Sequence, residues 1–219
     1  PPVKSLYVYG SNPAVVAPNS TKVRKGLARE NLFTVVHDLF LTETAKYADI
    51  VLPATSSFEN TDMYTSYWHH YIQLQQPVIE PFAESKSNVE VFRLLAKGMG
   101  FSEAPFAETE AEMITQALAN PRNPYLTGIS YEALVGQQFM KAQVKPIFPG
   151  TLETPSGKIE LFSKRMKESG YPPLPTYVPL VDDGNHRYQF VPGPNHNFLN
   201  STFSNNQKHI TLEKELKVY

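Results

Sequence analysis

The chain has 219 residues, of which 41% are hydrophobic and 19% are charged, a composition typical of one or two globular domains. Its 20 basic and 21 acidic residues give a net charge of -1, without the basic excess expected of a nucleic-acid-binding protein. The sequence contains no cysteine, so no disulfide, thiolate nucleophile, iron–sulfur cluster or cysteine–zinc site can reside in it.

The sequence also bears on membrane insertion and export. No apolar run approaches the ~18 residues of a membrane-spanning helix, and we expect no membrane span. No signal peptide is visible, which favours the cytoplasm. The chain opens with Pro1-Pro2 and runs directly into a predicted strand, so residue 1 need not be a natural start.

The N-terminal segment predicts a strand followed by a turn and a helix. The apolar run Leu6–Tyr9 predicts the strand, and the Gly-Ser-Asn-Pro sequence after it predicts a tight turn. Gly10 can adopt backbone conformations that other residues avoid, and it lets the chain approach a ligand closely. A helix is predicted from an N-cap at Asn19 or Ser20 to about Glu30. A turn of this kind is usually an ordinary connection rather than a phosphate site.

A second strand–loop–strand unit follows. The strand Leu32–His37 runs into Asp38, and a short helix capped by Thr42–Thr44 leads to a third strand, Asp49–Leu52, which Pro53 ends. Ligands of open parallel sheets bind beyond the carboxyl ends of the strands. Asp38 is therefore a candidate for contact with a ribose hydroxyl or a base N–H, and the alternative is a helix cap or a loop salt bridge. His37 is predicted to be a packed histidine rather than a ligand.

The aromatic segment Met63–Gln76 contains the pair His69-His70. Adjacent histidines on a strand point to opposite faces, and no third ligand stands at a suitable spacing. We therefore predict no metal site here, and we interpret the segment as an aromatic groove wall or a domain contact.

Three helices with apolar stripes are predicted next, and they indicate packing rather than chemistry. The first has Ser87 as N-cap with Glu90 completing a capping box, and it ends at Gly98 or Gly100. The other two span about Glu108–Leu118 and Ser130–Met140.

The C-terminal part is richer in proline. We predict a strand over Ile159–Phe162, a helix over Ser163–Glu168 and a further strand over Arg187–Val191. The proline-dense segment Tyr171–Pro179 is the candidate domain boundary. The cluster Asn200–Asn205 carries short polar side chains.

Several of these segments, taken in order, resemble the molybdopterin oxidoreductases of the dimethyl sulfoxide reductase and formate dehydrogenase superfamily. The strongest is Asp-Leu-Phe-Leu-Thr-Glu-Thr-Ala from Asp38, followed by Tyr-Ala-Asp-Ile-Val-Leu-Pro up to Pro53. Each match alone is modest, and their order and spacing make the resemblance specific. The other matching segments are Leu6–Pro13, Pro81–Phe92, Thr154–Phe162 and Asn200–Asn205.

The resemblance implies a central-to-C-terminal fragment of a longer catalytic chain. It implies an α/β fold, with an open, mainly parallel sheet flanked by helices over residues 1–175, followed by the start of a β-rich, barrel-like cap domain over residues 176–219. It implies a molybdenum or tungsten bis-molybdopterin guanine dinucleotide cofactor, which performs oxygen-atom or hydride-equivalent transfer. The metal ligand and a 4Fe–4S cluster are expected in the part of the chain that precedes this sequence.

The resemblance further implies that this fragment carries cofactor-binding residues but no catalytic residue and no metal ligand. Its partners would be the remainder of the catalytic chain, a small-molecule substrate and an electron-transfer subunit. The isolated fragment is therefore expected to bind cofactor weakly or not at all and to show no turnover. Elemental analysis tests this expectation, because a stoichiometric bound metal would refute it.

Individual roles follow from the same resemblance. Asn12, beside Gly10, would lie against a nucleotide phosphate or ribose. Asp38 would accept hydrogen bonds from guanine N–H groups, and Thr42 would support the same guanine or its ribose.

Three more residues are implied in cofactor binding. Asn88 stands where many relatives carry an aspartate that faces the cofactor. Ser201 and Thr202 would meet the pterin or a phosphate of the other nucleotide tail. The loop Glu59–Tyr67 lacks the glycine-, asparagine- and arginine-rich pattern of many nitrate and formate enzymes, which argues against those substrates.

Two other functions remain open from the residues alone. One is an independent nucleotide- or NAD-binding domain, for which the sequence lacks the full Gly-x-Gly-x-x-Gly turn. The other is a non-catalytic interaction module that uses the aromatic segment Tyr64–Tyr71.

Overall fold

The computed structural model describes residues 3–144, 150, 152–179, 184, 188, 193 and 195–213. The chain forms two compact units, one made of Pro1–Gln143 with Pro194–Tyr219 and the other of Val144–Gly193. The predicted strand Arg187–Val191 lies outside the described residues, apart from Tyr188. The predicted division into 1–175 and 176–219 stays a prediction. No helix of the described part has the length and apolar character needed to cross a membrane.

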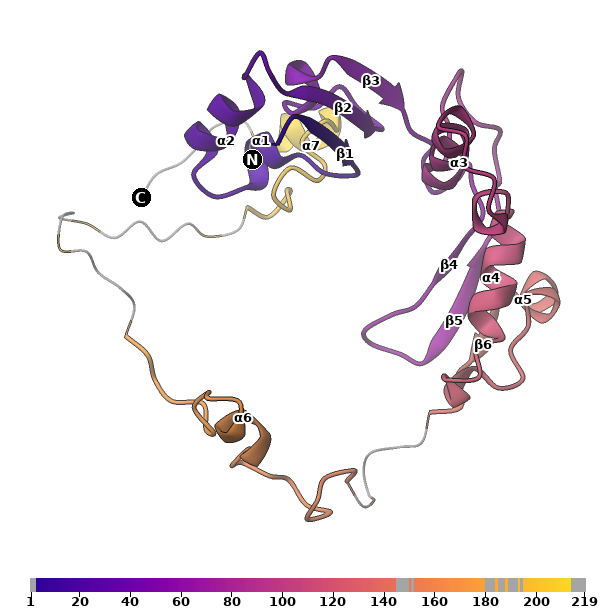
Figure 1. Cartoon of the computed structure of the whole chain (residues 1–219), viewed down its shortest axis with the longest axis vertical. Helices are drawn as coiled ribbons and strands as arrows, with labels where there is room; N and C mark the ends of the chain where they lie inside the picture. The colour runs from indigo at the N-terminus through magenta and orange to yellow at the C-terminus, as the bar shows by residue number, and fades with distance from the viewer. Residues whose placement is uncertain are drawn as a thin grey trace. The chain divides into compact units, whose positions relative to one another are not determined.

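A parallel sheet of three strands forms the start of the first unit (Figure 1). Its strands are β1 (Ser5–Tyr9), β2 (Phe33–Asp38) and β3 (Ile50–Pro53), in the order β1-β2-β3. β2 is the central strand, with β1 and β3 hydrogen-bonded on either side, and its Val36 is fully buried. Apolar and β-branched residues suit such a buried position, which explains why these runs form strands. The structure thus confirms the predicted α/β class with an open parallel sheet.

The connections of this sheet are short helices. The crossover from β1 to β2 contains α1 (Pro13–Val16) and α2 (Ser20–Leu27), and the crossover from β2 to β3 contains η1 (Ala45–Tyr47). The Asn19 side chain caps α2 by accepting from Lys22 N, as predicted, although the helix ends at Leu27 rather than near Glu30. The helix α1 was not predicted. It begins with a proline, which the first turn of a helix tolerates.

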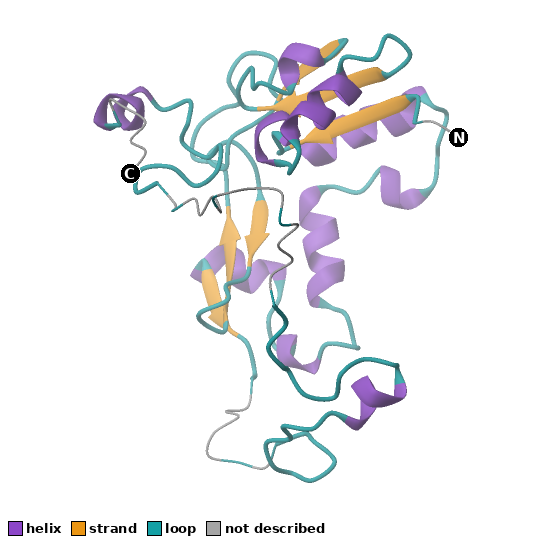
Figure 2. Cartoon of the chain, turned by 90° about the vertical axis from the view of Figure 1, so that its left-hand side faces the viewer, coloured by secondary structure: helices purple, strands orange, loops and turns teal. Residues whose placement is uncertain are grey.

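A second, antiparallel sheet was not predicted. It consists of β4 (Asp62–Tyr64), β5 (Tyr71–Gln75) and β6 (Phe139–Lys141), in that order (Figure 2). Its apolar face packs against α4 (Glu110–Leu118) and α5 (Tyr131–Gln137). The residues buried in this core are Ile72, Leu74, Ile114, Leu118, Ile129 and Leu134.

The predicted helix Ser130–Met140 is therefore too long at its C-terminal end. It ends at Gln137, because Gln138 adopts a positive φ of 68° and the next three residues pair with β5 as β6. Two short 3-10 helices, η2 (Ala104–Phe106) and η3 (Pro124–Leu126), lie in the connections before α4 and α5.

Helix α3 (Asn88–Gly98) begins as predicted, with the Ser87 side chain accepting from Glu90 N. The predicted capping box is only half formed, because the Glu90 carboxylate pairs with Lys86 Nζ instead of returning to the cap. A complete capping box is found on α4, between Thr109 and Glu112.

The second unit contains α6 (Lys164–Glu168), close to the predicted helix Ser163–Glu168, and the Ser163 side chain caps it by accepting from Met166 N. The predicted strand Ile159–Phe162 is wrong, because these residues form no ladder. Local hydrogen bonds hold the preceding turn instead. Thr154 Oγ1 donates to Lys158 O, and the Glu160 carboxylate accepts from Ser156 N. Ile159 consequently stays exposed despite the alternating pattern.

His37 is a packed histidine, as predicted. Its ring is fully buried, and Nε2 lies 3.1 Å from the carbonyl oxygen of Lys86. Because a carbonyl only accepts, this nitrogen donates, and the bond ties the connector before α3 to the sheet. Lys86 also forms an isolated parallel bridge with Ala54, just beyond β3.

Candidate functional site

A pocket of about 500 Å³ lies at the carboxyl edge of the parallel sheet. Three segments of the first unit line it: the turn after β1 (residues 10–12), the loop after β2 (residues 38–40 and 42) and a C-terminal segment (residues 201–203, 205 and 206). The last segment leads into α7 (Gln207–Leu212), a short helix that Asn206 caps. The pocket thus brings together six of the seven predicted site residues, namely Gly10, Asn12, Asp38, Thr42, Ser201 and Thr202.

The turn after β1 follows from the strand register. Tyr9 pairs with His37, so the carboxyl ends of β1 and β2 come to the same edge, and Gly10 N donates to His37 O over 3.2 Å. Gly10 has a φ of 55°, which favours glycine. Apart from its two chain neighbours, no atom of the described residues lies within 4 Å of where its Cβ would stand, so conformation rather than space requires glycine here.

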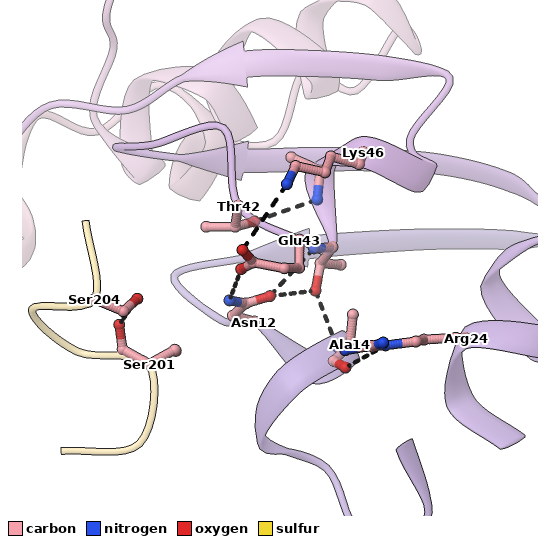
Figure 3. Close-up of polar contacts among 10 residues, drawn as sticks. Asn12, Ala14, Arg24, Thr42, Glu43, Lys46, Ser201 and Ser204 are labelled. Carbon is pink, nitrogen blue, oxygen red and sulfur yellow. Dashed lines mark hydrogen bonds and ion pairs between the residues drawn. The ribbon is translucent and has the colours of Figure 1, made fainter. Parts of the chain in front are cut away.

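Asn12 joins the two loops through a buried hydrogen-bond network (Figure 3). Its side-chain oxygen accepts from Thr44 Oγ1 over 2.7 Å and from Thr44 N over 3.2 Å, and its Nδ2 donates to Glu43 Oε2 over 3.0 Å. Thr44 Oγ1 in turn accepts from Ala14 N over 3.0 Å. Asn12 is only 5% exposed, so this network fixes the turn after β1 against the loop after β2.

These contacts limit what Asn12 can offer to a ligand. The amide oxygen already accepts two hydrogen bonds, and one of its two N–H groups is given to Glu43. Among the described residues nothing accepts from the second N–H, which leaves it for a phosphate or ribose. The Thr42 hydroxyl oxygen likewise already accepts one hydrogen bond, from Ala45 N over 3.2 Å, and Thr42 is buried.

Asp38 is the acidic group of the pocket. Its Oδ1 accepts from Leu39 N over 2.7 Å, and Ala54 N donates to its carbonyl oxygen over 3.1 Å, so backbone and side chain are both held. Within the described part of the chain, no group hydrogen-bonds to Oδ2. Asp38 therefore presents a partly accessible carboxylate oxygen to the pocket.

The C-terminal segment closes the opposite wall. Thr202 N donates to Leu199 O over 2.9 Å, and Ser204 Oγ donates to Ser201 O over 2.6 Å, which holds the segment in a tight turn. Figure 3 shows Ser201 and Ser204 on their own stretch of backbone, across from Asn12 and Glu43. Hydroxyl and amide groups from this wall face a pocket whose other wall carries Asp38.

Asn88 lies apart from the other six residues. It stands at the start of α3 and lines a separate pocket of about 160 Å³ together with Asn60 and Met113. Its role at the cofactor remains a prediction.

Two residues of the network, Glu43 and Thr44, were interpreted from the sequence only as helix-capping residues. Their actual partner, Asn12, lies 31 and 32 residues earlier in the chain, and no local pattern connects them. The sequence does contain one signal for the rest of the pocket. Leu39-Phe40-Leu41 is an apolar run inside a predicted loop, where polar residues are expected.

Glu43 makes the network sensitive to acid. The Asn12 side chain, which donates to its carboxylate, lowers the pKa of Glu43 below the ordinary 4.5, and the backbone N–H of Glu43 acts in the same direction. A lowered folded-state pKa gives stability that is present above about 4.5 and is lost as the pH falls through the folded pKa. Because the side chain is 47% exposed, we expect this contribution to stay below about 1 kcal/mol.

We predict that Glu43→Gln, which keeps an acceptor but removes the charge, flattens the fall of the unfolding free energy between about pH 5 and pH 3. Chemical denaturation at several pH values measures this slope, with the exposed Glu80→Gln as the matched control. Equal slopes for Glu43→Gln and the unsubstituted chain would contradict the assigned role of the carboxylate.

No cluster of three or more histidine, cysteine, aspartate or glutamate side chains in the described part of the chain is arranged to hold a metal ion. One histidine of the pair in the aromatic segment, His69, is engaged locally. His69 Nδ1 accepts from Tyr71 N over 3.2 Å, and its ring packs edge-on against the Tyr71 ring.

The chain is similar to known proteins over most of its length. A family model described as molybdopterin oxidoreductase matches residues 2–98. "Probable oxidoreductase YoaE" of Bacillus subtilis is 67% identical over the whole chain, which covers 32% of that protein. The dimethyl sulfoxide/trimethylamine N-oxide reductase of Cereibacter sphaeroides is 31% identical over 81% of this chain, which covers 24% of the reductase.

A solved structure is also similar. The acetylene hydratase from Pelobacter acetylenicus matches with a TM-score of 0.61 and 31% identity, over 81% of this chain and 24% of the hydratase. The chain spans about a third or less of the length of these relatives. The matched family model, the shared sequence and the shared fold agree, and the chain belongs to the molybdopterin oxidoreductase family.

Proposed function

We propose that this chain holds the guanine nucleotide end of a bis-molybdopterin guanine dinucleotide cofactor within a larger molybdopterin-dependent oxidoreductase. The observation that carries the proposal is the pocket at the carboxyl edge of the parallel sheet, into which Asp38 presents a carboxylate oxygen without a partner among the described residues. This is the edge at which open α/β sheets bind their ligands.

The carboxylate acceptor of the pocket fits guanine better than adenine. Guanine carries adjacent N–H groups on N1 and N2, and a carboxylate can accept from both in charge-assisted bonds. Adenine has an unprotonated N1 at the matching position, which would repel Asp38. The second N–H of Asn12 suits a phosphate or ribose oxygen of this nucleotide. Ser201 and Thr202 line the same pocket, and their hydroxyls suit phosphate oxygens either of this nucleotide or, as the resemblance implies, of the other tail.

The similarities support a role in cofactor binding rather than in a particular reaction. A reductase and a hydratase match this chain at the same identity of 31% and over the same 81% of its length. A segment that proteins with different reactions both match is expected to serve what those proteins have in common. A pocket for the distal end of a common cofactor meets that expectation.

The cofactor, when bound, would supply oxygen-atom or hydride-equivalent transfer at molybdenum or tungsten. The residues of this chain would bind and orient its nucleotide tail, with Asn88 placed as a further contact. The metal ligand and the 4Fe–4S cluster would come from other parts of the longer chain, together with the substrate site and the contact to an electron-transfer subunit. Residues 1–175 would form the nucleotide-binding domain, and residues 176–219 the start of the cap domain.

Titration of the chain with GMP, AMP and NAD by calorimetry tests the proposal. We expect GMP to bind at least about tenfold more tightly than AMP, since a carboxylate discriminates by hydrogen-bonding groups rather than by shape. A preference for NAD over GMP would instead support the independent nucleotide-binding domain. The expectation of weak or absent binding by the fragment concerns the whole cofactor, whereas the nucleotide alone should bind at millimolar concentration. Absence of GMP binding there would count against a guanine site in the pocket.

One observation favours an additional role as an interaction module. Tyr67 is fully exposed and Trp68 almost fully exposed in the loop between β4 and β5. Large aromatic side chains in full contact with water are typical of a surface that another protein segment covers. If they serve that purpose, Trp68→Ala should weaken assembly of the larger enzyme without changing GMP binding to the pocket.

A further inference from the structure

The pocket at the sheet edge has an apolar side as well as a polar one. Leu39 and Phe40 line it from the loop after β2, and Phe203 lines it from the C-terminal segment. Leu39, Phe40 and the next residue, Leu41, are 52%, 53% and 66% exposed. Three consecutive exposed apolar residues in a loop are unusual unless they serve a binding function.

The ring of Phe203 is held in place on one face. The His209 imidazole stacks on it with a centroid distance of 5.0 Å and an interplanar angle of 16°. His209 is itself fixed, because its Nδ1 lies 2.7 Å from Asn197 O. His209 does not line the pocket, whereas Phe203 does, and Phe203 stays 55% exposed despite the stack.

The backbone of this turn is equally constrained. Thr202 N donates to Leu199 O and Asn206 N donates to Phe203 O, both over 2.9 Å. Phe203 itself has a φ of 67°, a left-handed conformation that a phenylalanine seldom adopts. An aromatic ring that is fixed before a ligand arrives loses little conformational freedom on binding.

We infer that Phe203 is a base-stacking residue of the pocket, which contacts the ring face of a purine while Asp38 binds its edge. Phe40 adds apolar surface from the other wall. The inference rests on the proposed function and deepens it, since it assigns recognition of the base to two separate parts of the chain. Stacking on an aromatic side chain is tolerant of base identity, so Phe203 supplies affinity and Asp38 supplies the choice of guanine.

The test compares Phe203→Leu and Phe203→Asn in the full chain, with GMP and ribose 5-phosphate as ligands. We expect both variants to weaken GMP binding about tenfold, the effect typical of losing one aromatic stack, and to leave ribose 5-phosphate binding unchanged. Asparagine adopts the left-handed conformation readily, so Phe203→Asn keeps the turn even if Phe203→Leu disturbs it. The exposed Phe82, which lies outside the pocket, provides the control variant Phe82→Leu.

A second readout uses fluorescence. Trp68 is the only tryptophan of the chain, so a Trp68→Phe, Phe203→Trp double variant carries a single indole at the pocket. Guanine quenches indole fluorescence on contact, and GMP should quench this variant while ribose 5-phosphate should not. Unchanged GMP affinity in both Phe203 variants, with no quenching, would overturn the stacking role even if the chain binds GMP. If the unsubstituted chain does not bind GMP at all, the result contradicts the proposed function itself and not only the stacking role of Phe203.

Discussion

Replacing Asp38 by asparagine should weaken GMP binding about 10- to 100-fold, and it should strengthen AMP binding slightly because the repulsion of adenine N1 is removed. A hydrogen bond to a charged group is worth about 1.5–3 kcal/mol, and guanine offers two donors to this carboxylate. Asparagine can accept only through its oxygen and places an NH₂ group beside a guanine donor. The preference for GMP over AMP should therefore fall toward equality, as measured by calorimetric titration of both nucleotides.

Asp62 provides a closely matched control for this experiment. Its Oδ1 accepts from the N–H of the next residue, Met63, over 2.7 Å, as Asp38 Oδ1 does from Leu39 N. Asp62 belongs to the antiparallel sheet and does not line the pocket at the edge of the parallel sheet. Asp62→Asn should leave both nucleotide affinities unchanged. Equal losses in the two variants would point to a general charge effect and would contradict a specific contact at Asp38.

Replacing Asn12 by alanine should lower the free energy of unfolding by about 2–4 kcal/mol. The substitution removes the hydrogen-bond partner of Thr44 N, Thr44 Oγ1 and the Glu43 carboxylate, all of which bond to the Asn12 side chain in the folded chain. Each buried polar group left without a partner costs about 1–3 kcal/mol. The half-exposed Glu43 can turn to water, which keeps the total below the sum of the three losses.

Urea denaturation followed by circular dichroism measures this loss. The control is Asn120→Ala, since Asn120 is exposed and, among the described residues, its side chain accepts only from Arg122 N, two residues away. We expect that variant to lose no more than about 1 kcal/mol. If Asn12→Ala lost no more unfolding free energy than this control, the network would not hold the two loops together.

The sequence predicted those parts of the fold that depend on local patterns. Apolar runs predicted β1, β2 and β3, Ser87 was identified as a helix cap, and Asn19 was one of two candidates for another. The antiparallel sheet escaped prediction because β4 and β6 have three residues each, and β6 pairs with a strand more than sixty residues earlier. The segment Ile159–Phe162 shows the opposite error, since an alternating pattern without a partner strand forms no ladder.

The candidate site was likewise predicted only in part. Gly10 and Asp38 come together because parallel strands bring their carboxyl ends to one edge, and this could be reasoned from the residues. For Ser201 and Thr202 the resemblance implied a contact with the pterin or a phosphate of the other tail, and their place in the same pocket as Asp38 was not predicted. The bonds between Asn12, Glu43 and Thr44 could not be predicted, because they connect two loops through side chains alone.

The most direct test of the guanine pocket is an NMR titration of the ¹⁵N-labelled chain with GMP. We predict that the amide shifts that change with GMP belong to residues 10–12, 38–42 and 201–206, the three segments that line the pocket, and that AMP at equal concentration changes them less. Shift changes confined to other segments, such as the start of α3 around Asn88, would contradict the assignment of guanine binding to the edge of the parallel sheet.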